Sequence, residues 1–95
     1  MITGCSSFRK EREIVRDANF YYERGLKNME DKDYMKAVTD FQTVVESFSE
    51  SAVVPHAQFL LGEAHYKSEE YLTAAFEFER VYTDYPASEY AMEAQ

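Results

Sequence analysis

The sequence matches itself when it is shifted by 37 residues, and this internal repeat constrains the fold more than any other feature. Small and aromatic residues coincide under the shift in the same order. The aligned pairs are Gly25 with Gly62, Tyr34 with Tyr71, Ala37 with Ala74, Phe41 with Phe78, Val44 with Val81 and Ser51 with Ser88. The last two residues, 94–95, align with 57–58, so the chain contains two copies and the opening of a third.

Each copy is predicted to form two helices. Apolar residues recur at intervals of three and four over 34–48 and 71–85, which is the pattern of an amphipathic helix. The segments 56–67 and roughly 11–29 are predicted to be the first helices of the two pairs.

Polar side chains and prolines mark the ends of these helices. The turns at 31–33 and 68–70 offer N-capping side chains to the second helix of each pair. Ser51 and Ser88 are predicted to be N-caps of the helices that follow them. Pro55 is expected in a first turn, where its missing N–H costs least, and Pro86 at the end of a helix.

The repeated glycines predict close contact between helices. Gly25 and Gly62 are predicted to lie mid-helix, where glycine costs about 1 kcal/mol relative to alanine. An alanine follows each glycine twelve residues later, where the returning helix would cross it, and a phenylalanine follows one turn beyond. We therefore expect the small residues to let the two backbones pack, with the phenylalanine filling the adjoining space.

The spacing Gly-x11-Ala-x3-Phe, with a tyrosine three residues before the alanine, resembles the tetratricopeptide repeat. The second copy also has the proline eight residues after the phenylalanine, whereas the first has Ser49 there, and the usual turn glycine is replaced by Lys32 and Glu69. The residues that carry the resemblance are Gly25, Tyr34, Ala37 and Phe41, then Gly62, Tyr71, Ala74, Phe78 and Pro86. The resemblance implies an all-α fold, a right-handed solenoid of antiparallel helix pairs.

The repeats divide the chain into four segments. Residues 1–10 are an N-terminal segment and linker, 11–51 the first repeat with an extended first helix, 52–88 the second repeat, and 89–95 the start of a truncated third. Because about three such repeats are normally needed for stability, we expect marginal stability or self-association of this chain.

Charge and composition exclude several classes of protein. The net charge of −8 argues against a nucleic-acid surface, which needs a basic footprint. No apolar run approaches the roughly 18 residues of a membrane span. A single cysteine excludes a disulfide framework within the chain. The charge is uneven, because residues 37–95 hold two basic and eleven acidic side chains.

The N-terminal segment contains a possible lipid site. The sequence Ile-Thr-Gly-Cys at 2–5 resembles a bacterial lipobox, in which Cys5 would receive the lipid. Four basic residues between 9 and 16 would then lie near anionic head groups. Only Met1 precedes these residues, so the rest of a signal peptide would have to lie upstream. The alternative is an ordinary free cysteine in a frayed terminus.

Lipobox and repeats together resemble the BamD family of outer-membrane β-barrel assembly lipoproteins. The shared strings are Tyr-x2-Gly at 22–25, Asp-Tyr-x2-Ala at 33–37 and Tyr-Pro-x-Ser-x-Tyr-Ala at 85–91. The resemblance implies the N-terminal part of a periplasmic scaffold, anchored to the outer membrane by lipid on Cys5. It implies two protein partners, the barrel-forming assembly subunit and unfolded outer-membrane proteins.

The repeat register predicts a concave wall built from the first helix of each pair. Its apolar, aromatic and acidic side chains suit an extended peptide. The alternative for each of these side chains is packing against the neighbouring repeat. The predicted groove residues are Asn19, Tyr22, Met29, His56, Phe59, Glu63 and Tyr66, with Leu26 and Glu93 as further members of the wall.

No catalytic or metal-binding constellation is recognisable, so neither an enzyme nor a cofactor is expected. Cys5 has no neighbouring histidine in the sequence. His56 and His65 are nine residues apart, which does not place them on one helical face for a metal. The carboxylates occur at the spacing of a solvated helix surface and do not suggest an acid–base pair.

Two other functions stay open. One is a different envelope tetratricopeptide protein, such as a cell-division coordinator of the barrel-assembly or Tol machinery. The other is a cytosolic adaptor that binds peptide tails, which would need a basic clamp for a terminal carboxylate. Lys67 is the one basic residue near the predicted groove, which counts against the adaptor.

Overall fold

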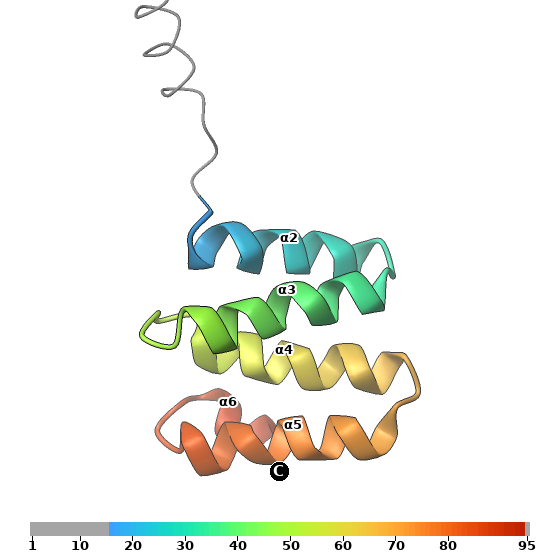
Figure 1. Cartoon of the computed structure of the whole chain (residues 1–95). Coiled ribbons are helices and arrows are strands. Elements are labelled where there is room, and N and C mark those ends of the chain that lie inside the picture. The colour runs from blue at the N-terminus through green and yellow to red at the C-terminus, as the bar shows by residue number, and fades with distance from the viewer. Residues whose placement is uncertain (1–15, 95) are drawn as a thin grey trace, which may run out of the picture.

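A computed structural model describes residues 16–94, and within this range the chain contains helices and no strands. Each helix packs on the one before it, so that two antiparallel pairs stack in sequence order (Figure 1). The predicted all-α class is confirmed. The helices are α2 (Ala18–Glu30), α3 (Tyr34–Ser47), α4 (Val54–Lys67), α5 (Tyr71–Asp84) and the short α6 (Tyr90–Ala94).

The helix boundaries agree with the predictions at most ends. Helices α3 and α5 begin at the predicted residues and end one residue early, while α4 begins two residues early with Pro55 in its first turn. The predicted start of the first helix is wrong, because Arg16 and Asp17 are not helical. Asp17 has extended backbone and its carboxylate accepts the Phe20 N–H at 3.0 Å, which sets the beginning of α2. The predicted segment 11–15 lies outside the described residues.

The predicted N-caps are correct in one turn and wrong in others. Asp33 caps α3, because its carboxylate accepts the Lys36 N–H at 3.5 Å. Glu70 makes no cap bond to α5, and its carboxylate lies 2.7 Å from Nδ1 of His65 instead. Ser51 is not the N-cap of α4, which begins later.

Ser51 and Ser88 act in the connections that lead into α4 and α6. Val53 occupies the N-cap position of α4, and the Ser51 hydroxyl accepts its N–H at 3.3 Å. The Ser88 hydroxyl likewise accepts the N–H of Tyr90 at 3.1 Å. Both serines therefore order a turn before the helix.

The turns inside the two pairs share an unusual backbone conformation. Lys32 and Glu69 have φ angles of 63° and 67°, in the left-handed region that favours glycine. These are the positions at which the resemblance leads one to expect glycine. Each turn therefore carries a side chain at the cost of some backbone strain.

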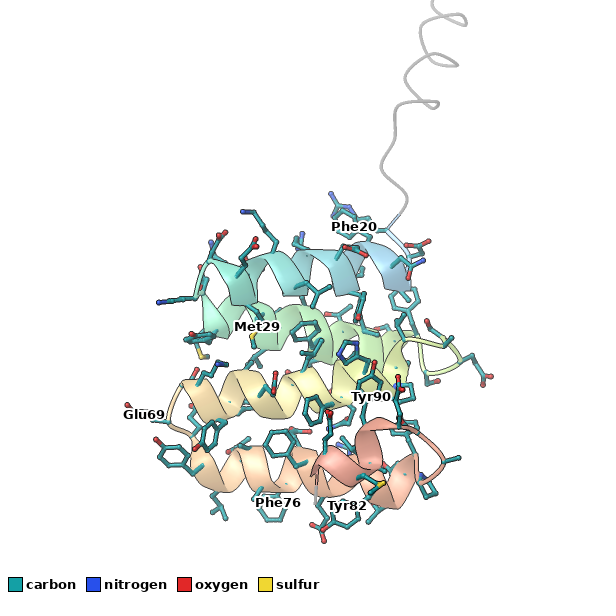
Figure 2. The ribbon with its side chains drawn as sticks, turned by 180° about the vertical axis from the view of Figure 1, so that it is seen from behind. Phe20, Met29, Glu69, Phe76, Tyr82 and Tyr90 are labelled. Carbon is teal, nitrogen blue, oxygen red and sulfur yellow. The ribbon has the colours of Figure 1, made fainter. Side chains whose placement is uncertain are left out.

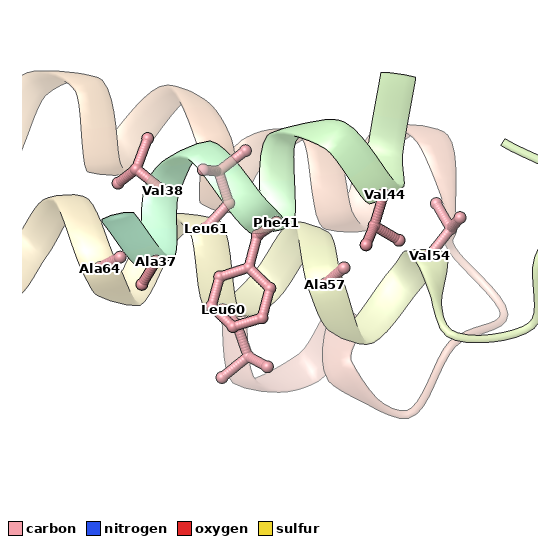
Figure 3. Close-up of a cluster of buried hydrophobic side chains, with 9 residues drawn as sticks. All are labelled: Ala37, Val38, Phe41, Val44, Val54, Ala57, Leu60, Leu61 and Ala64. Carbon is pink, nitrogen blue, oxygen red and sulfur yellow. The ribbon is translucent and has the colours of Figure 1, made fainter. Parts of the chain in front are cut away.

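The central core lies between α3 and α4 (Figure 3). Phe41 is fully buried in it, and partly buried side chains, several of them from α2, pack against the cluster. The buried members of the cluster are Ala37, Val38, Phe41, Val44, Val54, Ala57, Leu60, Leu61 and Ala64.

Each mid-helix glycine faces a phenylalanine ring from the other helix of its pair. A Cβ built on Gly25 would lie 2.6 Å from Cε1 of Phe41, and one built on Gly62 would lie 2.6 Å from Cδ1 of Phe78. Real Cβ contacts are longer, so a larger residue fits at either position only if the phenylalanine ring shifts. The ring occupies the space that a side chain on the glycine would need.

A buried carboxylate ties α2 to α3. Asp40 is 2% exposed and accepts hydrogen bonds from Nη2 of Arg24 at 2.8 Å and from Nδ2 of Asn28 at 2.8 Å. The bond to Asp40 raises the pKa of Arg24, so the guanidinium stays charged. This network could not be predicted from the sequence, since nothing in the helical periodicity marks Asp40 as a buried residue.

Candidate peptide-binding surface

The first helix of each pair and the short helix α6 carry an aromatic strip. It is formed by Tyr22 of α2, His56 of α4 and Tyr90 of α6. The Tyr22 hydroxyl lies 2.5 Å from Nδ1 of His56, and the His56 ring stacks on Tyr90 with centroids 4.3 Å apart and planes 5° apart. Figure 2 shows Tyr90 over the face of α4. The strip therefore joins three helices with one ring from each.

Phenylalanine rings lie next to the aromatic strip. Phe59 of α4 lies 5.8 Å from Tyr90 and 5.4 Å from Phe78 of α5, measured between ring centroids. Phe41 is 6.4 Å from Tyr22 in the first pair. The strip is thus continuous with the rings that pack against the two glycines.

An open hollow of about 320 Å³ adjoins the strip, and we call it the α4 hollow. Its apolar walls come from two phenylalanines, and Tyr66 stands at its edge with 57% of its surface exposed. Two carboxylates and one ammonium group complete it. The lining residues are Phe59, Glu63, Tyr66, Lys67, Phe78 and Glu93.

Burial shifts the ionisation of the groups on this surface. Desolvation lowers the pKa of His56 below 6.5, against the opposing charges of Glu89 and Glu93. The imidazole is therefore neutral at pH 7, and its Nδ1 can accept a hydrogen bond from the Tyr22 hydroxyl. Desolvation also raises the pKa of Tyr22, which keeps that proton in place.

Glu63 is a carboxylate of the α4 hollow with a raised pKa. Burial is the main cause that raises its pKa, and the charge of Glu93 acts in the same direction. Lys67 acts against both. A partner with a cation or an N–H donor would therefore relieve an unfavourable negative charge at this place.

The structure distributes the predicted groove residues over four surroundings. Phe59, Glu63 and Tyr66 meet in the α4 hollow, as does Glu93, while Tyr22 and His56 meet in the strip. Met29 and Leu26 are partly buried against the core. Asn19 is exposed on α2 and does not line the hollow.

Phe78 and Tyr90 were not predicted as members of this surface. For Phe78 the sequence predicts a structural role alone. Tyr90 follows His56 by 34 residues, and His56 follows Tyr22 by the same interval. This spacing, which is the usual tetratricopeptide period, is the sequence signal that identifies the strip.

The other predicted positions lie as follows. Among the repeat positions, Gly25, Ala37, Phe41, Gly62 and Ala74 are buried, Tyr34 and Phe78 are half-buried, and Tyr71 and Pro86 are exposed. Cys5 lies outside the described residues. Residues 16–94 contain no group of three or more metal-ligating side chains placed to hold an ion, and none of their helices is long and apolar enough to cross a membrane.

Comparison with known proteins places the chain in a family. Residues 15–95 match the family model described as YfiO, outer membrane lipoprotein. The outer membrane protein assembly factor BamD of Helicobacter pylori is 31% identical over 78 residues, which are 81% of this chain and 36% of the relative. The chain thus spans about a third of that relative's length, and no solved structure gives a significant match. Because the family model covers most of the sequence, the chain belongs to the YfiO family of outer membrane lipoproteins and is a relative of BamD.

Proposed function

We propose that the protein is a non-enzymatic scaffold of outer-membrane protein assembly, which holds unfolded outer-membrane proteins against the α4 hollow and the aromatic strip. The name of the Helicobacter pylori relative gives an assembly role to that protein. Partner subunits of the assembly machinery, including the barrel-forming subunit, would bind to the same solenoid. Cys5 would carry the lipid that holds the protein at the periplasmic face of the outer membrane.

The α4 hollow is the observation that carries this proposal. Phe59 and Phe78 give it apolar walls, and Tyr66 adds an exposed ring at its edge. Such a hollow suits an aromatic side chain of an extended peptide, since aromatic anchors dominate peptide recognition. Glu63 and Glu93 outnumber Lys67 there, which disfavours a terminal carboxylate and with it the cytosolic adaptor.

The test is the binding of a fluorescein-labelled synthetic peptide with the alternating aromatic and polar sequence of a barrel strand. We expect Tyr66→Ser to weaken its binding about tenfold, as measured by fluorescence anisotropy. Phe76→Ser is the matched control, because Phe76 is 59% exposed and lies on α5 outside the hollow. Equal affinity of the two variants would refute the proposed groove.

The lipid anchor has a separate test in cells. Cys5→Ser, introduced into the full-length gene, is expected to move the protein from the membrane fraction to the soluble periplasmic fraction. The wild-type chain should carry added acyl mass on a mature N-terminus at Cys5, as measured by intact-mass spectrometry. An unmodified wild-type chain would remove the anchor from the proposal and leave the α4 hollow unaffected.

A further inference from the structure

Helix α5 has a second apolar stripe on the side away from α4. One stripe faces the stack through residues such as Ala74 and Val81, both buried. The other lines an open hollow of about 230 Å³, in which Leu72 is 74% exposed and Phe76 is 59% exposed. We call this the α5 hollow, and its lining residues are Leu72, Ala75, Phe76, Glu79 and Tyr82.

Figure 2 shows Phe76 and Tyr82 at the edge of the stack beyond α5. Phe76 and Phe78 are two residues apart, which separates them by about 200° around the helix axis. The α5 hollow is therefore a different surface from the α4 hollow, which Phe78 lines. A helix with apolar residues on two faces is normally covered on both.

Helix α3 shows how much of this second stripe another helix of the stack would cover. The 37-residue shift places Ala75 on Val38, which is only 7% exposed beneath α4. Leu72 falls on Met35, which stays 61% exposed although α4 packs on α3.

Two of the three remaining positions behave like Met35, whereas Tyr82 falls on Val45, which is partly buried against the core. Phe76 falls on Thr39 and Glu79 on Gln42, and both α3 residues are exposed. A helix that packs on α5 as α4 packs on α3 would therefore bury Ala75 and leave Leu72 and Phe76 in solvent. Continuation of the stack does not account for these two large apolar side chains.

The charge around the α5 hollow indicates what kind of molecule could bind there. Glu79 is the charged residue that lines it, and Glu79 forms no ion pair within residues 16–94. Residues 37–95 carry eleven acidic and two basic side chains. A second copy of the chain or an anionic lipid surface would bring further negative charge to this face.

We propose that the α5 hollow docks a cationic amphipathic helix of a partner protein. Apolar side chains of this helix, four residues apart, pack against Leu72 and Phe76, and a lysine or arginine pairs with Glu79. The pairing places the partner's positive charge on the acidic half of the molecule, which steers its approach. This docking site is independent of the α4 hollow and of the function proposed for it.

The probe is a synthetic helical peptide with leucines at i and i+4 flanked by lysines, together with a twin in which glutamates replace the lysines. We expect the lysine peptide to bind the full chain, as measured by fluorescence anisotropy. The double variant Leu72→Ser/Phe76→Ser should raise the Kd of this peptide about tenfold. Met35→Ser is the matched control at the same register on α3 and should leave the Kd unchanged. Tyr66→Ser, in the other hollow, should also leave it unchanged.

Reversal of charge gives the second arm of the test. Glu79→Lys is expected to weaken the lysine peptide and to strengthen the glutamate twin. All the substituted side chains are exposed or line the surface, so circular dichroism should show unchanged helix content. The proposal is wrong if the double variant binds as the wild type does, or if Met35→Ser is equally damaging. It is also wrong if sedimentation shows a dimer that the double variant dissociates, because the occupant would then be a second copy.

Discussion

Gly25 and Gly62 face the same kind of ring, but the two rings differ in their freedom to move. Phe41 is completely buried, whereas Phe78 is half-buried and lines the α4 hollow. We expect Gly25→Ala to lower the free energy of unfolding by about 2–3 kcal/mol through overpacking, and Gly62→Ala by about 1 kcal/mol. Urea titration followed by circular dichroism measures both.

A double variant identifies the ring as the cause. Phe41→Leu shortens the side chain that meets the new methyl group, so Gly25→Ala should cost less in that background. Additive losses in the double variant would show that the cost of Gly25→Ala comes from another contact.

Lys32 and Glu69 predict a gain of stability on substitution. Both residues hold the left-handed backbone region, which costs a residue with a Cβ about 1 kcal/mol. Lys32→Gly and Glu69→Gly should each raise the midpoint of urea unfolding, offset in part by a more flexible unfolded chain. Lys32→Ala retains the Cβ and should give no gain; an equal gain from alanine would mean that the lysine side chain was the source of strain.

His56 predicts a dependence of stability on pH. Its pKa is lowered in the folded state by burial, so the unfolded chain binds a proton first as the pH falls below about 6.5. The contribution of His56 is therefore complete above this pH and is lost as the pH falls toward its folded pKa. Urea titrations at several pH values should show a smaller loss for His56→Phe than for the wild type.

At the scale of helices, the ion pair between Arg24 and Asp40 joins α2 to α3. Arg24→Met would leave a carboxylate that is 2% exposed with Asn28 as its remaining side-chain partner. Because Arg24 itself is about half exposed, we expect a loss of about 1–2 kcal/mol in the free energy of unfolding. Lys27→Met removes exposed pairs on the same helix and should change it by less than about 0.5 kcal/mol. Equal losses from Arg24→Met and Lys27→Met would show that the contact with Asp40 adds nothing beyond the effect of a charged side chain on α2.

The helices could be predicted from sequence because their information is local. Periodicity located α3 and α5 to within one residue, and Pro55 marked the start of α4. The beginning of α2 was predicted wrongly, since charged residues before Asp17 continue a helical pattern that the Asp17 cap interrupts. Glu70 was also predicted wrongly, because its carboxylate pairs with His65 in place of a backbone N–H.

The residues of the candidate site that lie together on one helix could be predicted from the sequence, and those from other helices could not. Phe59, Glu63 and Tyr66 share a face of α4 by their spacing alone. Phe78 and Tyr90 come from α5 and α6, so their membership depends on how the helices stack. Periodicity within a helix carries no information about how neighbouring helices stack.

The whole molecule carries an unbalanced charge, which acts on its stability. The net charge is −8, and most of the acidic side chains lie in residues 37–95. Repulsion among them opposes the compact state and is screened by salt. We expect the Tm to rise by about 4–8 °C between about 10 and about 200 mM NaCl, equivalent to about 1 kcal/mol. A Tm that falls with salt would show that the favourable ion pairs outweigh the repulsion.

The stacking order has a consequence in time as well as in space. Nearly every helix contact joins consecutive elements, and α4 with α6 is the one substantial exception among the described helices. Chains with such short-range contacts fold quickly, because little loop entropy is lost before each contact forms. Each helix can therefore pack on its partner soon after both have been synthesised. The layers can therefore form in sequence order, each helix packing on the one before it.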